Sequence, residues 1–173
     1  MTLPERFHVA SDHQLAREAA ERLFASMQAQ LVAILPATCE VLHIGATAVP
    51  GCLTKGDLDI VVRVEREDFA AAEAALAARF ARNSGSIQTE AFAAFEDEAC
   101  TPHLGIQLTV KGGELDIFHR FVAALRADPV LVSRYNALKI AHDGQSMDDY
   151  RAAKDAFVTN VLRLASSESR DER

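Results

Sequence analysis

The segment from His43 to Val64 constrains the fold more than any other part of the chain. It reads HIGATAVPGCLTKGDLDIVVRV, in which two apolar runs flank a loop that contains glycine and proline. β-Branched residues dominate the second run, and glycine and proline are typical of turns and loops. The segment therefore predicts a strand over residues 40–45, a loop, and a second strand over residues 58–64.

The rest of the chain predicts a single α+β domain over residues 1–165. Apolar residues recur at helical spacing between Asp12, a candidate N-cap, and Pro36, which ends the run. We expect a mixed β-sheet with helices packed on one face and C-terminal helices beyond it. The expected elements are helices at 12–35, 66–81, from about 118, 129–142 and 147–164, strands at 87–96 and 104–111, either a short strand or a helix start at 115–117, and a disordered tail at 166–173.

Composition narrows the class of protein. Apolar residues make up 49% of the 173 residues, as in a globular domain, and the net charge of −7 disfavours binding to an extended nucleic acid. No apolar run approaches the length of a membrane span, and no signal peptide is evident, so we expect a cytoplasmic protein. The three cysteines, Cys39, Cys52 and Cys100, lack metal-binding spacing and are expected to be reduced thiols.

The Asp57-Leu58-Asp59 sequence is the strongest candidate for chemistry. Alternate residues of a strand share a face, so Asp57 and Asp59 would point the same way. Two adjacent carboxylates repel unless a cation lies between them, and their oxygens suit Mg²⁺ or Mn²⁺. The alternative is that Asp57 lies in the turn and only Asp59 faces solvent.

The loop before this pair is a candidate phosphate site. Gly45 allows close approach of the backbone, and the N–H groups of Ala46 and Thr47 could hold phosphate oxygens. Lys55 is either a further phosphate contact or an ordinary solvated loop residue. His43 is either a buried histidine or a residue that orients the site.

The segment HIGATAVPGCLTKGDLDIVV resembles the signature of the GrpB family (UPF0157), whose members usually read HIGSTAVPG followed by a lysine and Ile-Asp-Ile. That family is placed in the nucleotidyltransferase superfamily, related in fold to DNA polymerase β. The resemblance implies transfer of a nucleotidyl group from a nucleoside triphosphate to an unknown small acceptor, with Mg²⁺ or Mn²⁺ bound by Asp57 and Asp59. It also implies phosphate contacts from Lys139 and Lys154 on the C-terminal helices, although both lysines could equally belong to a solvated helix face.

Two departures from the family pattern have opposite implications for this expected activity. Ala46 replaces the usual serine, which removes one hydroxyl from the phosphate loop, whereas Asp57 restores an Asp-x-Asp pair that GrpB members usually lack. Catalytic members of the superfamily use a third acid from a neighbouring strand, and the corresponding residue here is Gln107. Asp116 is the remaining candidate for that acid, or else it caps a helix. A noncatalytic nucleotide-binding or interaction module on the same fold is therefore the competing hypothesis.

Overall fold

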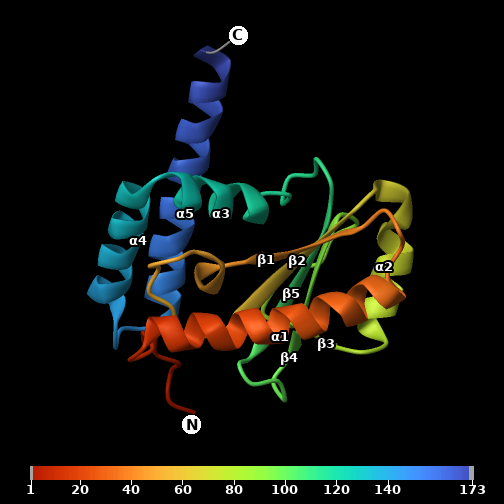
Figure 1. Cartoon of the computed structure of the whole chain (residues 1–173), viewed down its shortest axis with the longest axis horizontal. Helices are drawn as coiled ribbons and strands as arrows, with labels where there is room; N and C mark the ends of the chain where they lie inside the picture. The colour runs from red at the N-terminus through yellow and green to blue at the C-terminus, as the bar shows by residue number, and fades with distance from the viewer. Residues whose placement is uncertain (1, 172–173) are drawn as a thin grey trace.

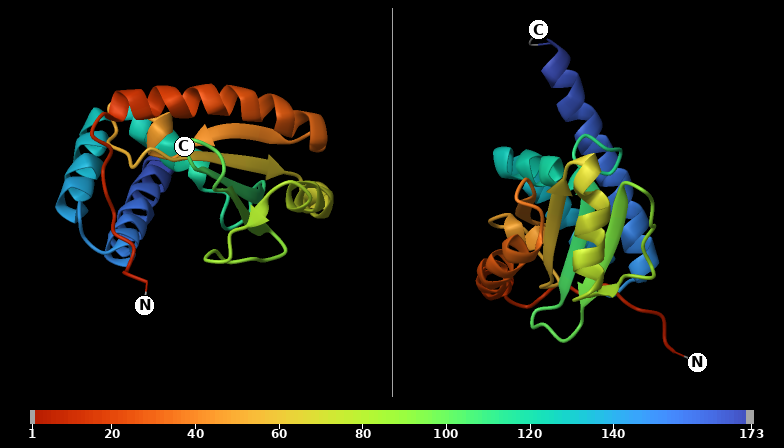
Figure 2. Two further views of the ribbon diagram at one scale, coloured as in Figure 1. Left: turned by 90° about the horizontal axis from the view of Figure 1, so that it is seen from below. Right: turned by 90° about the vertical axis from the view of Figure 1, so that its right-hand side faces the viewer.

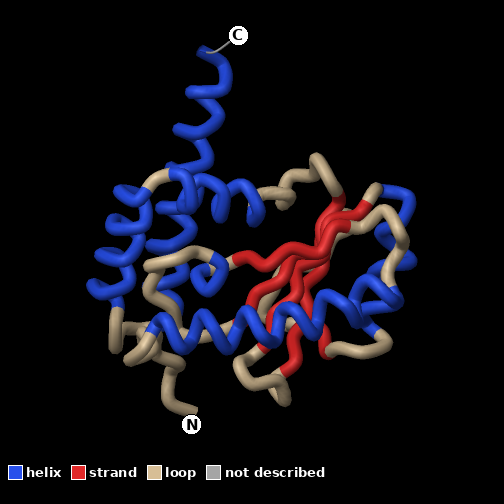
Figure 3. Tube along the Cα trace, viewed as in Figure 1, coloured by secondary structure: helices blue, strands red, loops and turns tan. Residues whose placement is uncertain are grey.

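The fold is built on one five-stranded β-sheet, and the computed structural model describes residues 2–171 (Figure 1). The strands lie in the order β1-β2-β5-β4-β3. β2 and β5 are parallel, whereas the other neighbours are antiparallel, so the sheet is mixed (Figure 3). Their bounds are β1 Glu40–Ile44, β2 Leu58–Val64, β3 Ala81–Arg82, β4 Phe92–Asp97 and β5 Leu104–Val110.

Helices cover both faces of the sheet (Figure 2). Two of them, α1 (His13–Ile34) and α2 (Phe69–Ala77), pack with the apolar side chains of one face into the main core. The C-terminal helices α3 (Phe118–Ala127), α4 (Pro129–His142) and α5 (Met147–Asp171) form a second core against Ile44 and Val61 on the other face. This arrangement confirms the α+β class and the mixed sheet with C-terminal helices.

Two aspartates fix where the helices beside the site begin. Asp12 caps α1, because its side chain accepts hydrogen bonds from the backbone N–H groups of Gln14 and Leu15. Asp128 caps α4 in the same way and precedes Pro129, which suits the first turn of a helix. Both starts agree with the sequence.

The region between β2 and β5 differs from its prediction. The alanine-rich helix expected over residues 66–81 ends at Ala77, and Ala81 and Arg82 instead pair with β4 as an edge strand. The strand expected over residues 87–96 begins only at Phe92. Residues 115–117 form a turn into α3 rather than a strand. Pairing with β4 outweighs the helix propensity of alanine here.

The end of the chain is more ordered than predicted. α5 continues to Asp171, so residues 166–171 are helical and are not the disordered tail expected for residues 166–173; residues 172–173 lie outside the described part. The hydroxyl of Ser166 donates to the carbonyl of Leu162 at 2.9 Å, and Ser169 donates to Ala165 at 3.0 Å, so serines stay within the helix. Figure 1 shows this end of α5 projecting beyond the sheet. None of the described helices combines the length and hydropathy that a membrane crossing requires.

Candidate functional site

Asp57 and Asp59 lie at the amino end of β2, beside the C-terminal helices. Asp57 immediately precedes the strand, and Asp59 occupies the face that carries Val61. Both carboxylates line a small cavity of about 60 Å³, which we call the polar cavity. Its other lining residues are Phe7, Ala46, Thr54, Lys55, Tyr135, Lys139, Tyr150 and Lys154. The structure thus brings the two aspartates together with Ala46 and all three lysines proposed from the sequence.

The carboxylate of Asp59 is held between two glycines. A Cβ atom at Gly45 would lie 2.8 Å from Asp59 Oδ2, and one at Gly105 would lie 2.8 Å from Oδ1. Gly45 also has a φ of 75°, which favours glycine on its own. A side chain at either position would displace the carboxylate, so the two glycines define the space that Asp59 occupies.

Asp59 lacks a partner for its charge. No side-chain hydrogen bond or ion pair reaches its carboxylate from residues 2–171, whereas Lys55 Nζ lies 3.0 Å from Asp57 Oδ2. Burial raises the pKa of Asp59; Lys154 opposes this shift and the negative charge of Asp57 adds to it. A partly buried carboxylate without a partner is stabilised by a cation or by a proton.

The donor set fits a divalent cation in part. Carboxylate oxygens are the ligands that Mg²⁺ and Mn²⁺ prefer, and Mg²⁺ commonly binds through one or two carboxylates together with substrate phosphates. Asp57 and Asp59 meet this requirement. Among residues 2–171, however, no group of three or more His, Cys, Asp or Glu side chains converges as a ready-made metal site. The remaining ligands would have to come from phosphate oxygens and water.

Thr47 joins the loop to the start of β2. Its side chain is buried, and its hydroxyl donates to the carbonyl oxygen of Asp57 at 3.0 Å. His43 Nε2 lies 2.9 Å from the same hydroxyl. Burial lowers the pKa of His43 to about 4, and Arg126 and Arg17 add to this, so the neutral ring donates to Thr47 at neutral pH. Thr47 therefore positions Asp57, and its hydroxyl is not directed at a phosphate.

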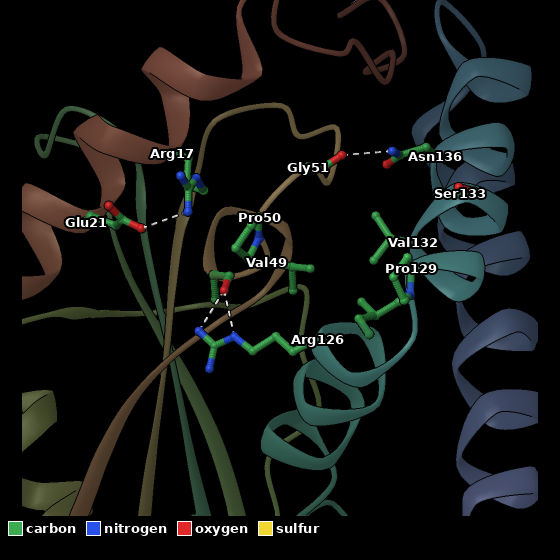
Figure 4. A pocket seen from close by; sticks show the side chains of 12 residues that line it. Arg17, Glu21, Val49, Pro50, Gly51, Arg126, Pro129, Val132, Ser133 and Asn136 are labelled. Carbon is green, nitrogen blue, oxygen red and sulfur yellow. Dashed lines mark hydrogen bonds and ion pairs between the residues drawn. The ribbon is translucent and has the colours of Figure 1, made fainter.

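Three side chains from the C-terminal helices hold the loop in place. Arg126 donates from Nε and Nη2 to the carbonyl of Ala48, at 3.0 and 2.7 Å. Asn136 accepts from the backbone N–H of Leu53 at 2.8 Å and donates to the carbonyl of Gly51 at 2.9 Å (Figure 4). Lys139 donates to the carbonyl of Leu53. The loop is thus fixed by α3 and α4, and no local sequence pattern indicates that Arg126 and Asn136 act in this way.

The depression between these helices and α1 is wide and open, with a volume of about 620 Å³ (Figure 4). Two arginines line it, but both already have partners. Arg17 pairs with Glu21 at 3.3 Å, and Arg126 holds the loop. Arg126 in this depression therefore holds the loop, and the depression itself lies outside the polar cavity.

Three lysines line the polar cavity and supply its positive charge. Burial lowers the pKa of Lys139 to about 8, with Lys154 contributing in the same direction, and Lys139 Nζ lies 4.0 Å from the centre of the Tyr135 ring. Lys154 acts on Asp59 through its charge and lines the same cavity. Burial raises the pKa values of Tyr135 and Tyr150, so both phenols stay neutral.

The structure does not bring Asp116 to this pair. Its carboxylate accepts two hydrogen bonds from Arg63, each 2.7 Å long, and a third from the N–H of Gly112 at 2.8 Å. Burial alone would raise the pKa of Asp116, but these bonds outweigh it and the pKa falls. Arg63 lies four residues beyond Asp59 on β2, about 13 Å along the strand, so Asp116 stabilises the opposite end of the sheet.

Some contacts beside the site are not evident from local sequence patterns. His103 lies between two acids, with Nδ1 3.7 Å from Asp57 Oδ2 and Nε2 3.5 Å from Glu96 Oε2. Glu96 is opposite Gly105 in the sheet, and only the register of β4 against β5 reveals this. Phe7 stacks on Tyr150 with 3.7 Å between ring centres and lines the polar cavity. A lone aromatic residue before the first helix was its only sequence signal.

Comparison with known proteins gives consistent relatives. The sequence model described as GrpB protein matches residues 15–164. A UPF0157 protein of Vibrio cholerae is 32% identical over 161 residues, covering 92% of this chain and 83% of that protein. A crystal structure of the conserved protein GrpB from Enterococcus faecalis is 23% identical, with a TM-score of 0.68 over 87% of this chain and 94% of that one. The Cid1 poly(U) polymerase bound to MgGTP is 10% identical, with a TM-score of 0.49 over 76% of this chain and 41% of that one.

Proposed function

The chain belongs to the GrpB family, and on that premise we propose that it is a metal-dependent nucleotidyltransferase that acts on a small acceptor. One observation carries the proposal: Asp57 and Asp59 face three lysines across the polar cavity, and the Asp59 carboxylate has no partner among residues 2–171. Two neighbouring carboxylates, one of them without a partner, beside lysines are the groups that would hold a divalent cation together with phosphate oxygens.

The proposed reaction is a displacement at phosphorus. The acceptor hydroxyl oxygen forms a bond to the α-phosphorus, and the bond from that phosphorus to the oxygen bridging the β-phosphate breaks. Pyrophosphate leaves with the bonding electrons, and the hydroxyl proton passes to water. A bound divalent cation supplies charge neutralisation and draws the reacting oxygens together.

The residues of this chain contribute binding and orientation. Asp57 and Asp59 would hold the cation on a rigid strand, with Thr47 fixing the backbone of Asp57. Lys55, Lys139 and Lys154 would neutralise phosphate charge. A cavity of about 60 Å³ admits the ion and phosphate oxygens only, so the sugar and base would lie outside it.

A noncatalytic nucleotide-binding module on the same fold is the second candidate. Gln107 is favourable to it, because an amide on β5 beside Asp59 cannot act as a base or as a charged metal ligand. Ala46 adds a smaller effect: loss of one hydroxyl bond to a charged group weakens binding by about 1.5–3 kcal/mol. Such a protein would bind Mg²⁺ and nucleotide but release no pyrophosphate.

Calorimetry with each nucleoside triphosphate, with and without Mg²⁺, tests the binding part of the proposal. We expect Mg²⁺-dependent binding that Asp59→Asn removes and that Asp148→Asn, an exposed aspartate at the start of α5, retains. Absence of Mg²⁺-dependent binding at millimolar nucleotide would refute the proposal. Pyrophosphate release with an acceptor library then separates the enzyme from the binding module.

A further inference from the structure

A second cavity also borders Asp59 and is chemically unlike the first. Its volume is about 300 Å³, at the lower end of the range for small-molecule sites. Its walls, which define what we call the apolar cavity, are Ile44, Gly45, Asp59, Gln107, Leu115, Ile117, Phe118, Phe121, Tyr135, Lys154, Asp155 and Val158. Asp59, Tyr135 and Lys154 line both cavities, so a molecule in one lies next to a molecule in the other.

Gln107 lines the apolar cavity and carries a polar atom without a partner. Its Oε1 is buried and accepts no hydrogen bond from the described residues. A buried carbonyl without a donor is costly, by about 1–3 kcal/mol, so a turn of the side chain toward a ligand that brings an N–H or O–H group would relieve this cost. The atom is an acceptor only, which sets the polarity of the group it can recognise.

The charges around the apolar cavity select the ligand further. Two carboxylates, Asp59 and Asp155, line it against one lysine, Lys154. The polar cavity has the opposite balance, with three lysines and two carboxylates. Phosphate groups therefore suit the polar cavity, whereas the apolar cavity suits a neutral or positively charged molecule.

The geometry of displacement at phosphorus relates the two cavities. The attacking and leaving oxygens lie roughly in line on opposite sides of the phosphorus atom. If the leaving phosphates occupy the polar cavity, the attacking oxygen comes from the opposite side of the phosphorus atom and so from outside that cavity. The apolar cavity borders Asp59 as well and is the adjoining space that can hold the molecule carrying this oxygen.

From these observations we propose that the apolar cavity is the acceptor subsite. Its ligand is a neutral or positively charged small molecule with an apolar body, a hydroxyl group directed at Asp59, and a hydrogen-bond donor directed at Gln107. The acceptor role rests on the proposed function, but occupancy of the cavity does not require a nucleotide. Occupancy and nucleotide binding can therefore be measured separately.

The test uses three probes that share one body: 2-phenylethanol, 2-phenylethylamine and phenylacetate. We expect saturation-transfer NMR to detect binding of the neutral and positively charged probes at millimolar concentration. Phenylacetate should bind more weakly by about tenfold, because Asp59 and Asp155 repel its carboxylate. Gln107→Leu should weaken 2-phenylethylamine by about threefold to tenfold, the effect of one hydrogen bond, because its three N–H donors can reach Gln107 as well as Asp59. Failure of both favoured probes to bind, preferential binding of phenylacetate, or undiminished binding in Gln107→Leu would overturn the inference.

A blocking variant separates this subsite from the nucleotide. Val158 is partly buried on α5, where it lines the apolar cavity and packs at the edge of the second core, so Val158→Phe should fill the cavity; urea denaturation of the variant checks that the core is retained. The matched control is Val32→Phe, at an exposed position of α1, which packs on the other face of the sheet. Loss of 2-phenylethanol binding in Val158→Phe, with Mg²⁺-dependent nucleotide binding retained, supports the subsite. Loss of nucleotide binding with the blocking variant alone would mean that the nucleotide occupies this cavity, and would overturn it. If no variant and no wild-type protein binds nucleotide, the proposed function fails while the probe data still decide the occupancy.

Discussion

The polar and apolar cavities share the wall formed by Asp59, Tyr135 and Lys154, yet they are built from different parts of the chain. The polar cavity takes Lys55 and Asp57 from the loop before β2. The apolar cavity is lined mainly by the turn before α3, by α3 itself and by α5. One carboxylate on a strand can thus lie between a cavity suited to charged groups and a cavity suited to an apolar molecule.

Substitution of Lys154, which lines both cavities, should give the largest difference between nucleotide binding and probe binding. Lys154→Met removes the positive charge that acts most strongly on Asp59. We expect Mg²⁺-nucleotide affinity to fall by about tenfold to hundredfold, the usual effect of losing a hydrogen bond to a charged group. Binding of 2-phenylethanol should change much less. Calorimetry on the one ligand and NMR on the other measure both, and equal losses would show that the cavities are not separate in function.

Asn136 tests whether the loop of the polar cavity depends on α4. Asn136→Ala removes two hydrogen bonds and leaves the N–H of Leu53 without its partner. We expect the free energy of unfolding to fall by about 1–3 kcal/mol, together with weaker nucleotide binding. Ser133→Ala, an exposed residue one turn earlier on the same helix, is the control for urea denaturation. A loss of unfolding free energy no larger than that of the control would show that Asn136 does not stabilise the loop.

Gln107→Glu would add a third carboxylate to the apolar cavity and so increase the difference in charge between the two cavities. The new carboxylate would join Asp59 from the neighbouring strand, where a third acid is otherwise lacking. We expect Mn²⁺ to bind about tenfold more tightly, because the number of ligand charges sets affinity. Binding of 2-phenylethylamine should increase in parallel. Unchanged Mn²⁺ affinity, measured by electron paramagnetic resonance, would place residue 107 too far from the metal.

Lys139 gives the smallest expected effect, which concerns the polar cavity alone. Burial lowers its pKa to about 8 in the folded protein, below the value of 10.5 in an unfolded chain. The unfolded state therefore binds more protons between these values, so stability rises with pH in that window. The gain should be about 1 kcal/mol between roughly pH 7 and pH 9. Lys139→Met should abolish this rise in denaturation experiments, and an identical slope in both proteins would contradict the assignment.

Local sequence patterns predict most of the fold. The alternation in β2, the cap at Asp12 and the Asp128-Pro129 start of α4 each act over a few residues, and all three are present in the structure. The edge strand at Ala81 could not be predicted in this way. Its conformation depends on pairing with Phe95 and Glu96, which are distant in sequence.

The site residues show the same contrast between local sequence patterns and pairing of distant residues. Asp57, Asp59 and Lys55 lie within five residues of one another, so a local motif was enough to group them. Asp116 was grouped with them only because it is close to β5 in sequence, yet its pairing with Arg63 lies at the far end of β2. Gln107 was placed at the site only through the family resemblance, whereas Glu96 reaches it through the register of β4 against β5, which the sequence does not encode locally.

The central claim is that Asp57 and Asp59 bind a divalent cation together with a nucleotide. Mn²⁺ titration followed by electron paramagnetic resonance, with a non-hydrolysable nucleoside triphosphate analogue present, tests this most directly. We expect saturable Mn²⁺ binding in the wild-type protein and in Asp148→Asn, with affinity lowered by at least about tenfold in Asp59→Asn because one of two charged ligands is lost. Equal Mn²⁺ affinity in the wild-type protein and in Asp59→Asn would contradict it.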